Sequence, residues 1–485
     1  MSSLRKKLML QFLVSNGSTA ASFALSIVLA RLLSPSEIGI FSMTAIAVSF
    51  AHVFRDFGVV SFIKQQKELD ADIVASSAGV LIITSWLIAA ALYLLSGYWA
   101  DYFNEPGIEN VMHVLALGFV FIPFGSIPQA VLARNFEVEK QAIATLISTV
   151  TYITAAILFA LNDFSYMSMA WANLVNIIAS SACYIALRPP EVTSRISLRH
   201  WRRVVNFGTG AMLTSSLKAI DLALPDILLG KMSGPHQVGL FSRANSTVNI
   251  INHVAGPTIN YVALPYLARI HHGGHDMAAE LKRVIAYITG IFWPALAVIA
   301  VLAEPVIVLL YGAAWRDSAS AMVWLCLAVA AGTTFSLVQP ALTGIGRPYL
   351  SAIALVVAVL LKILFGILLY DGSLASFGIA IALADLLTMV PYVYLLRTYL
   401  GLGLGGIAQA LGKTSVVAAT VLGVTCACRF LLLPPDWPEA GIVAGTALLV
   451  VPVWYAAIRL TRHPLMKELS LLQVELGKRL KSPTV

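Results

Sequence analysis

The chain has 485 residues, of which 59% are apolar and only 12% are charged. A soluble protein carries about 25% charged residues, so this composition excludes a soluble globular enzyme. The apolar residues fall in blocks of about 20, the length that crosses a hydrocarbon core about 30 Å thick. The sequence therefore predicts an all-α polytopic membrane protein.

The apolar blocks and the turn signals between them predict fourteen transmembrane helices. The first block follows Arg5, Lys6 and Lys7 as in a signal peptide, but it runs past Leu29, so we expect a retained first helix. The expected spans are residues 8–31, 38–62, 73–96, 108–133, 141–161, 165–187, 204–230, 238–264, 283–303, 318–343, 349–370, 375–396, 414–433 and 440–460.

Most of the 32 Lys and Arg residues lie in the C-terminal tail or in loops on the side of the N-terminus. The opposite side holds only Arg31, Lys231, Arg316 and Arg429. By the positive-inside rule both termini are cytoplasmic. The net charge of +8 reflects this asymmetry and does not indicate a nucleic-acid partner.

The chain repeats itself at an offset of about 200 residues. "LARLLSPSEIGIFS" (29–42) aligns without a gap on "LGKMSGPHQVGLFS" (229–242). Because six helices separate the copies, both enter the membrane from the same side, which predicts two parallel six-helix lobes around a central cavity. The expected parts are an N-lobe (1–187), a basic cytoplasmic linker (188–203), a C-lobe (204–397), two extra helices (398–461) and a cytoplasmic tail (462–485).

Two segments outside the spans are expected at the inner membrane surface. The linker is predicted to be a cytoplasmic tether with a surface-lying part around Trp201. The tail carries a helical stripe that predicts an amphipathic helix on the membrane, and a plain solubilising tail is the alternative. The stripe consists of Leu465, Leu469, Leu472, Leu476 and Leu480.

Matched polar stripes follow one face of two repeat-related helices. The first contains Ser42, Ala45, Ser49, His52 and Asp56, and the second contains Ser242, Asn245, Asn249, Asn252 and Gly256. Polar helix–helix packing explains either stripe alone. Two stripes in register favour a shared, water-accessible cavity.

Eight charged residues lie within the predicted spans, where each costs about 2.5–3.5 kcal/mol on insertion scales. They are Arg55, Lys218, Arg243 and Lys362, with Asp56, Asp221, Asp226 and Asp385. One interpretation is neutralisation in the pairs Lys218–Asp221 and Lys362–Asp385. The other is a transport path in which three of the cations bind an anionic diphosphate and the carboxylates bind a proton or Na⁺. A kink is expected at Pro225.

These features resemble the multidrug/oligosaccharidyl-lipid/polysaccharide exporter superfamily, and within it the bacterial Wzx-type polysaccharide flippases. The resemblance is carried by "LARLLSPSEIGIFS", by "RDFG" (55–58), by "GLFSRA" (239–244) and by the doubled six-helix plan with two added helices. It implies an inner-membrane flippase that moves an undecaprenyl-diphosphate-linked oligosaccharide to the outer leaflet by alternating access. It also implies membrane lipid and polysaccharide polymerase or assembly proteins as partners.

On this resemblance the substrate path maps to particular residues, and a coupling proton or Na⁺ takes the place of a cofactor. Substrate-binding residues are Arg55, Lys218, Arg243, His52, Asn245, Asn249 and Asn252; ion-coupling candidates are Asp56, Asp221, Asp226 and Asp385; and the outer mouth holds Arg31 and Lys231. Lys362 is the structural-pair candidate. No catalytic residue and no metal site is expected.

Four other functions are considered at this point. A drug or cation antiporter of the same superfamily and a flippase for a lipid-linked peptidoglycan precursor are the nearest alternatives. A membrane enzyme is disfavoured because the longest expected outer loop, 96–108, is too short for a catalytic domain. "GIAQALGKTS" (406–415) is not a P-loop, since five residues separate its glycines and the motif needs four. A scaffold without transport leaves the charges in the spans unexplained.

Overall fold

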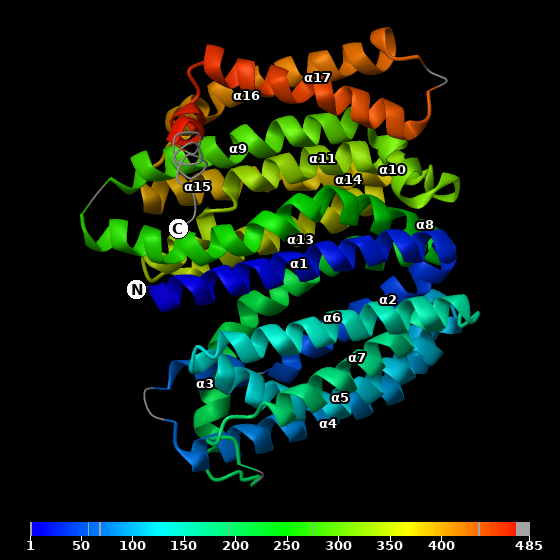
Figure 1. Ribbon diagram of the computed structural model, residues 1–485, viewed down its shortest axis with the longest axis vertical. Helices are drawn as coiled ribbons and strands as arrows, with labels where there is room; N and C mark the ends of the chain where they lie inside the picture. Colours follow the sequence, from blue (N-terminus) through cyan, green and yellow to red (C-terminus); the bar gives the residue numbers. More distant parts are fainter. Residues whose placement is uncertain are drawn as a thin grey trace, which may run out of the picture. The chain divides into compact units, whose positions relative to one another are not determined.

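The computed structural model describes residues 2–56, 58–66, 69–193, 195–274, 276–434 and 437–471. Within these ranges the regular secondary structure is helical, as Figure 1 shows. Twelve of the described helices are long and apolar enough to cross a membrane. The segment α8 (Trp201–His272) consists of two helices that meet at Gly234, where the backbone angles are not helical, and these cover two further predicted spans, 204–230 and 238–264. The expected all-α, polytopic membrane architecture is confirmed.

The chain forms two compact units, Met1–Ser242 and Arg243–Val485. α8 begins in the first unit and ends in the second. The other helices of the first unit are α1 (Ser2–Leu32), α2 (Pro35–Asp56), α3 (Val59–Gln65), α4 (Ala71–Phe103), α5 (Gly107–Arg134), α6 (Val138–Leu161) and α7 (Met167–Ala186). The second unit contains α9 (Met277–Val301), α10 (Ala303–Tyr311), α11 (Ser318–Phe335), α12 (Val338–Gly344), α13 (Ser351–Leu368), α14 (Leu374–Leu387), α15 (Met389–Leu400), α16 (Leu404–Ala427) and α17 (Glu439–Leu460).

The division between the units falls inside α8 and not in the linker 188–203. The cause is local packing, because the stretch of α8 before Ser242 lies against α4 and α2. A Cβ built on Gly230 would lie 2.9 Å from the ring of Phe103 and 3.1 Å from Met43 Cε. The lobes 1–187 and 204–397, which follow from the repeat, stay a prediction.

α4 is longer than expected. It runs to Phe103, and α5 begins at Gly107, so the predicted outer loop 96–108 is wrong. The helix ends where Asn104 adopts the left-handed conformation (φ 54°) and its N–H bonds back to the last turn. Asparagine tolerates this conformation, so Asn104 ends the helix in the way a C-terminal glycine does.

Three other predicted spans are interrupted. The span 38–62 breaks after Asp56, where Gly58 has φ 70° and α3 begins one residue later. α11 ends at Phe335 and α14 ends at Leu387. Each of these two ends lies four or five residues before a proline, Pro340 or Pro391. A proline ring clashes with the carbonyl four residues earlier, which ends the helical hydrogen bonding there.

The repeat segments 35–42 and 235–242 cross each other with their backbones in contact. A Cβ built on Gly39 would lie 1.8 Å from the carbonyl oxygen of Pro235, and one built on Gly239 would lie 1.9 Å from that of Pro35. Equivalent residues also meet. Ser36 Oγ lies 3.4 Å from His236 Nδ1, and Ser42 Oγ donates to Ser242 Oγ at 3.4 Å. Only an approximate two-fold axis through this crossing brings a residue against its own repeat equivalent.

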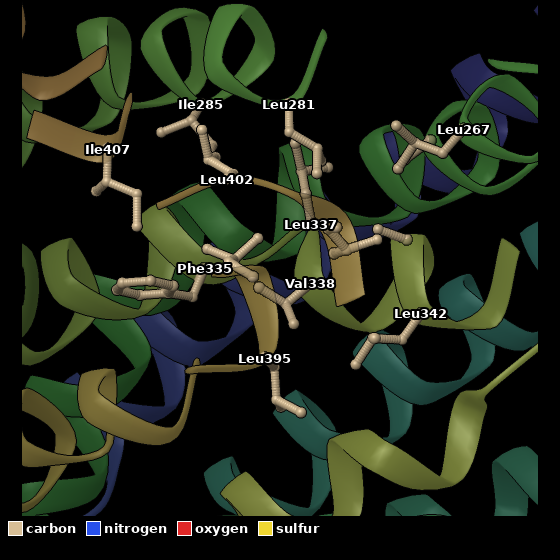
Figure 2. Close-up of a cluster of buried hydrophobic side chains, with 14 of the residues drawn as sticks. Leu267, Leu281, Ile285, Phe335, Leu337, Val338, Leu342, Leu395, Leu402 and Ile407 are labelled. Atoms are coloured by element: carbon tan, nitrogen blue, oxygen red, sulfur yellow. The ribbon is translucent and has the colours of Figure 1, made fainter. Parts of the chain in front are cut away.

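A buried apolar cluster holds together one end of the second unit. Figure 2 shows side chains from α8, α9, α12 and α15 together with Phe335, the last residue of α11. Leu281, Leu342 and Leu395 are each fully buried there. The ring of Phe335 stacks on Tyr392 with 5.6 Å between centroids. Burial of each such side chain contributes about 1.5–3 kcal/mol relative to exposure in water.

The first part of the tail lies on the protein, and the expected membrane-surface helix is wrong for these residues. Leu465 is 6% exposed and belongs to a cluster with Val417 and Ile458. Leu469 packs against the same cluster. Leu472, Leu476 and Leu480 lie outside the described residues.

His463 joins this tail to α9 and α16. Its Nδ1 accepts the N–H of Leu465 at 3.2 Å, and its Nε2 lies 3.0 Å from Thr414 Oγ1. Because Nδ1 is an acceptor, Nε2 carries the proton and donates to Thr414. The imidazole is 1% exposed and fits against Gly290, where a Cβ would lie 2.7 Å from its Cε1. The site therefore holds the neutral ring.

We predict that Gly39→Ala lowers the melting temperature of the purified protein. The added methyl group must push two backbones apart, and overpacking of this kind costs about 1–3 kcal/mol. Gly97→Ala is the matched control, because nothing lies within 4 Å of its Cβ position in α4. Equal thermal stability of the two variants would show that the crossing does not constrain the fold.

We predict a stability loss below about pH 6.5 that depends on His463. Burial, together with the nearby Lys413 ammonium, holds the pKa of His463 below its usual value of 6.5. Below this pH the unfolded chain therefore binds a proton at His463 that the folded chain does not bind. The contribution of His463 to the free energy of unfolding is complete above pH 6.5 and decreases as the pH falls below it.

The measurement is the melting temperature against pH for wild type, His463→Gln and the exposed-residue control His271→Gln. His463→Gln should flatten the slope below pH 6.5, whereas His271→Gln should keep it. The same slope in all three proteins contradicts a buried neutral His463.

Candidate functional site

Arg55 and His52 occupy the end of α2 in the first unit. Arg55 is only 9% exposed, and its carbonyl accepts a hydrogen bond from Thr84 Oγ1 of α4 at 3.3 Å. One turn earlier, the His52 ring lies 4.8 Å from the ring of Phe119 on α5. The side chain of Asp56 lies outside the described residues. α2 therefore places a guanidinium and an imidazole on adjacent turns among apolar helices.

The stretch of α8 that carries Lys218, Asp221 and Asp226 remains helical. Lys218 is exposed, whereas Asp221 and Asp226 are half-buried. The predicted kink at Pro225 is wrong as the place where α8 breaks, since the non-helical backbone angles lie at Gly234 (φ 75°, ψ −174°). A positive φ of this kind suits glycine, which lacks a Cβ.

Lys231, expected at the outer mouth, is bound to the end of α4. Its Nζ donates to the carbonyl of Tyr102 at 2.6 Å and lies 4.8 Å from the centre of the Tyr102 ring. This lysine therefore fastens α8 to α4. Arg31, its repeat equivalent in the last turn of α1, is exposed.

The second stripe forms a ladder of side-chain amides along α8. Asn252 Nδ2 donates to Asn249 Oδ1 at 3.0 Å, and Asn249 Nδ2 donates to Asn245 Oδ1 at 2.7 Å. Asn245 is exposed, as is Ser49 in the first stripe, so neither stripe is sealed inside a helix–helix contact. Carboxamides offer both donors and acceptors, which suits sugar hydroxyl groups.

Arg243 lies two residues before this ladder and is half-buried. Its carbonyl accepts from Thr247 Oγ1 at 2.8 Å, and the same hydroxyl lies 2.8 Å from the Tyr311 hydroxyl. The sequence analysis missed Tyr311 because α10 is a short helix that follows directly on a span. The only signal was a tyrosine at the end of an apolar run.

Lys362 of α13 and Asp385 of α14 form an ion pair with 3.3 Å between Nζ and Oδ1. Their side chains are 9% and 28% exposed. The spacing of these residues in consecutive spans predicted the contact, and the structure forms it. The attraction between the two charges therefore offsets part of the free energy that their removal from water costs. An isolated charge at either position has no such compensation.

Comparison with known proteins gives the family. The model of a family described as "Polysaccharide biosynthesis protein" matches residues 28–320. The chain belongs to this family. It is 23% identical to the succinoglycan biosynthesis transport protein ExoT of Rhizobium meliloti, over 94% of this chain and 93% of ExoT. It is 21% identical to the lipopolysaccharide biosynthesis protein WzxC of Escherichia coli, over 62% of this chain and 61% of WzxC.

The fold of this polysaccharide biosynthesis family member is similar to that of several solved structures. The lipid II flippase MurJ in an inward closed conformation matches 94% of this chain and all of its own with a TM-score of 0.76 at 12% identity. An inward-facing multidrug resistance MATE transporter of the MOP superfamily matches 79% of this chain and 96% of its own, with a TM-score of 0.64 at 15% identity. These matches confirm the fold that the resemblance implies.

We predict that removing one partner of the Lys362–Asp385 pair destabilises the protein more than replacing both. Lys362→Met leaves the Asp385 carboxylate without its counter-charge, at a cost of about 1–3 kcal/mol for a partly exposed group. Lys362→Met/Asp385→Leu removes both charges and should recover most of the melting temperature.

Transport complementation by the double variant then separates the two roles of the pair. A stable double variant that still transports identifies the pair as structural. A stable double variant that no longer transports would contradict this and make one of the two groups a substrate or ion ligand.

Proposed function

We propose that this protein is a flippase that moves a polyprenyl-diphosphate-linked oligosaccharide from the cytoplasmic to the outer leaflet of a bacterial inner membrane. The substrate is a repeat unit of exopolysaccharide, capsule or O-antigen. The near full-length similarity to a succinoglycan biosynthesis transport protein carries the proposal. The step is alternating-access transport and involves no covalent chemistry.

The described side chains fit the parts of such a substrate. Arg55, Lys218 and Arg243 provide cations for the diphosphate, since guanidinium and ammonium groups bind phosphate oxygens strongly. The amide ladder at Asn245, Asn249 and Asn252 offers donors and acceptors for sugar hydroxyl groups. Asp56, Asp221, Asp226 and Asp385 are the carboxylates proposed to couple transport to a proton or Na⁺.

We also propose that both termini are cytoplasmic, on the charge asymmetry of the loops. Within the first unit, Lys7 of α1 lies 3.8 Å from Glu139 at the start of α6. The N-terminal end of α1 therefore lies at the same end of this unit as the loop between α5 and α6, as the charge pattern requires. Polysaccharide polymerase or assembly proteins are the proposed partners on the outer side.

The test is deletion of the gene, followed by complementation with wild type, Lys218→Gln, Lys218→Arg and Lys64→Gln. Lys218 is exposed, so its loss should leave folding intact, and Lys64 is an exposed control lysine of the same unit. A charged hydrogen bond to phosphate contributes about 1.5–3 kcal/mol, so Lys218→Gln should transport at least tenfold more slowly. Lys218→Arg and Lys64→Gln should restore surface polysaccharide.

The deletion strain should accumulate the lipid-linked oligosaccharide on the cytoplasmic side and lose surface polysaccharide. Intact polysaccharide with new sensitivity to cationic drugs would replace the proposal with an antiporter. Accumulation of the lipid-linked peptidoglycan precursor would instead identify that lipid as the substrate.

A further inference from the structure

The linker between α7 and α8 lies against the first turns of α4. The N–H of Ser197 donates to the carbonyl of Ala75 at 3.1 Å, and the N–H of His200 donates to Ser76 Oγ at 3.3 Å. A Cβ built on Gly79 would lie 2.2 Å from the Ser197 carbonyl oxygen. Figure 1 shows this segment at the same end of the first unit as α3.

The point of contact has a defined depth along α4. With 33 residues, α4 is about 50 Å long, so it exceeds a hydrocarbon core of about 30 Å by about 20 Å. Shared between both ends, this leaves about 10 Å outside the core on the side of Ala71. Gly79 lies about 12 Å from that end. The linker therefore crosses α4 where the headgroups meet the hydrocarbon.

At this level the linker exposes apolar side chains. Ile196 is 64% exposed, Leu198 46% and Trp201 47%. The guanidinium of Arg202 lies over the Trp201 ring, 5.6 Å from its centre. Tryptophan is typical of the membrane–water interface, because most of its ring is apolar while its N–H can reach water.

The same segment carries four exposed arginines, Arg195, Arg199, Arg202 and Arg203. Arg199 lies 3.5 Å from the carboxylate of Asp72, and Arg203 donates to Gln66 Oε1 at 3.2 Å. These two contacts hold the segment in place. Because they involve only one carboxylate, that of Asp72, the segment with its four arginines keeps a strong positive charge. Positive charge at this depth is complementary to anionic lipid headgroups.

We propose that residues 195–203 form a binding site for anionic phospholipids of the cytoplasmic leaflet. Arg195 and Arg202 bind the headgroup phosphates, and Ile196, Leu198 and Trp201 enter the boundary of the acyl chains. Contact with α4 fixes the segment at that depth. This lipid is distinct from the transported substrate, so the site stands or falls independently of the flippase proposal.

The test is native mass spectrometry of the full-length protein titrated with phosphatidylglycerol or with phosphatidylcholine. Arg195→Gln/Arg202→Gln should weaken phosphatidylglycerol binding about thirtyfold. The charge-conserving variant Arg195→Lys/Arg202→Lys should stay within about threefold of wild type. The control Lys6→Gln/Lys64→Gln, which removes two exposed charges elsewhere in the same unit, should do the same.

Unchanged binding by the glutamine variant, or an equal loss in the control, overturns the proposal. A second measurement uses only the wild type, namely hydrogen exchange of peptides covering 195–203 in nanodiscs. Protection should appear with phosphatidylglycerol and be absent with phosphatidylcholine alone. Protection that is independent of lipid charge would also overturn the site, and would indicate burial by protein.

Discussion

Two helix backbones can touch only where a residue without a side chain faces the other backbone, and this constraint sets the geometry of the crossing in the first unit. Gly39 meets the Pro235 carbonyl and Gly239 meets the Pro35 carbonyl, so the same spacing of proline and glycine is used twice. The crossing fixes the rotation of α2 and α8 about their own axes. Both polar stripes begin there, at Ser42 and Ser242, which face each other at 3.4 Å.

The charges within the spans are accommodated in different ways, although a hydropathy scale treats them alike. Lys362 and Asp385 neutralise each other across two helices. Arg55 is buried at the end of α2, whereas Lys218 is exposed on α8. Of these groups, the exposed ammonium of Lys218 would undergo the largest change in solvent exposure when it binds an anionic group. The ion pair connects α13 and α14.

Two segments with the same amphipathic pattern reach different environments. Leu465 in the tail finds apolar partners on α16 and α17, and the neutral ring of His463 connects the tail to them. Leu198 and Trp201 in the linker stay exposed, although the backbone of that segment and the Arg199 side chain contact α4. A helical stripe of leucines therefore indicates a partner surface without saying whether that surface is lipid or protein.

The sequence by itself determined the membrane architecture, the repeat and the matched stripes, and it offered the Lys362–Asp385 contact as one of two interpretations. Each depends on composition, on a periodicity or on spacing in consecutive spans, which are properties of the local chain. Only the tertiary structure decided that Lys231 binds Tyr102 and that the tail packs on α9 and α16. These outcomes depend on which surfaces meet, and residues far apart in the sequence compete for the same carbonyl, ring or apolar face.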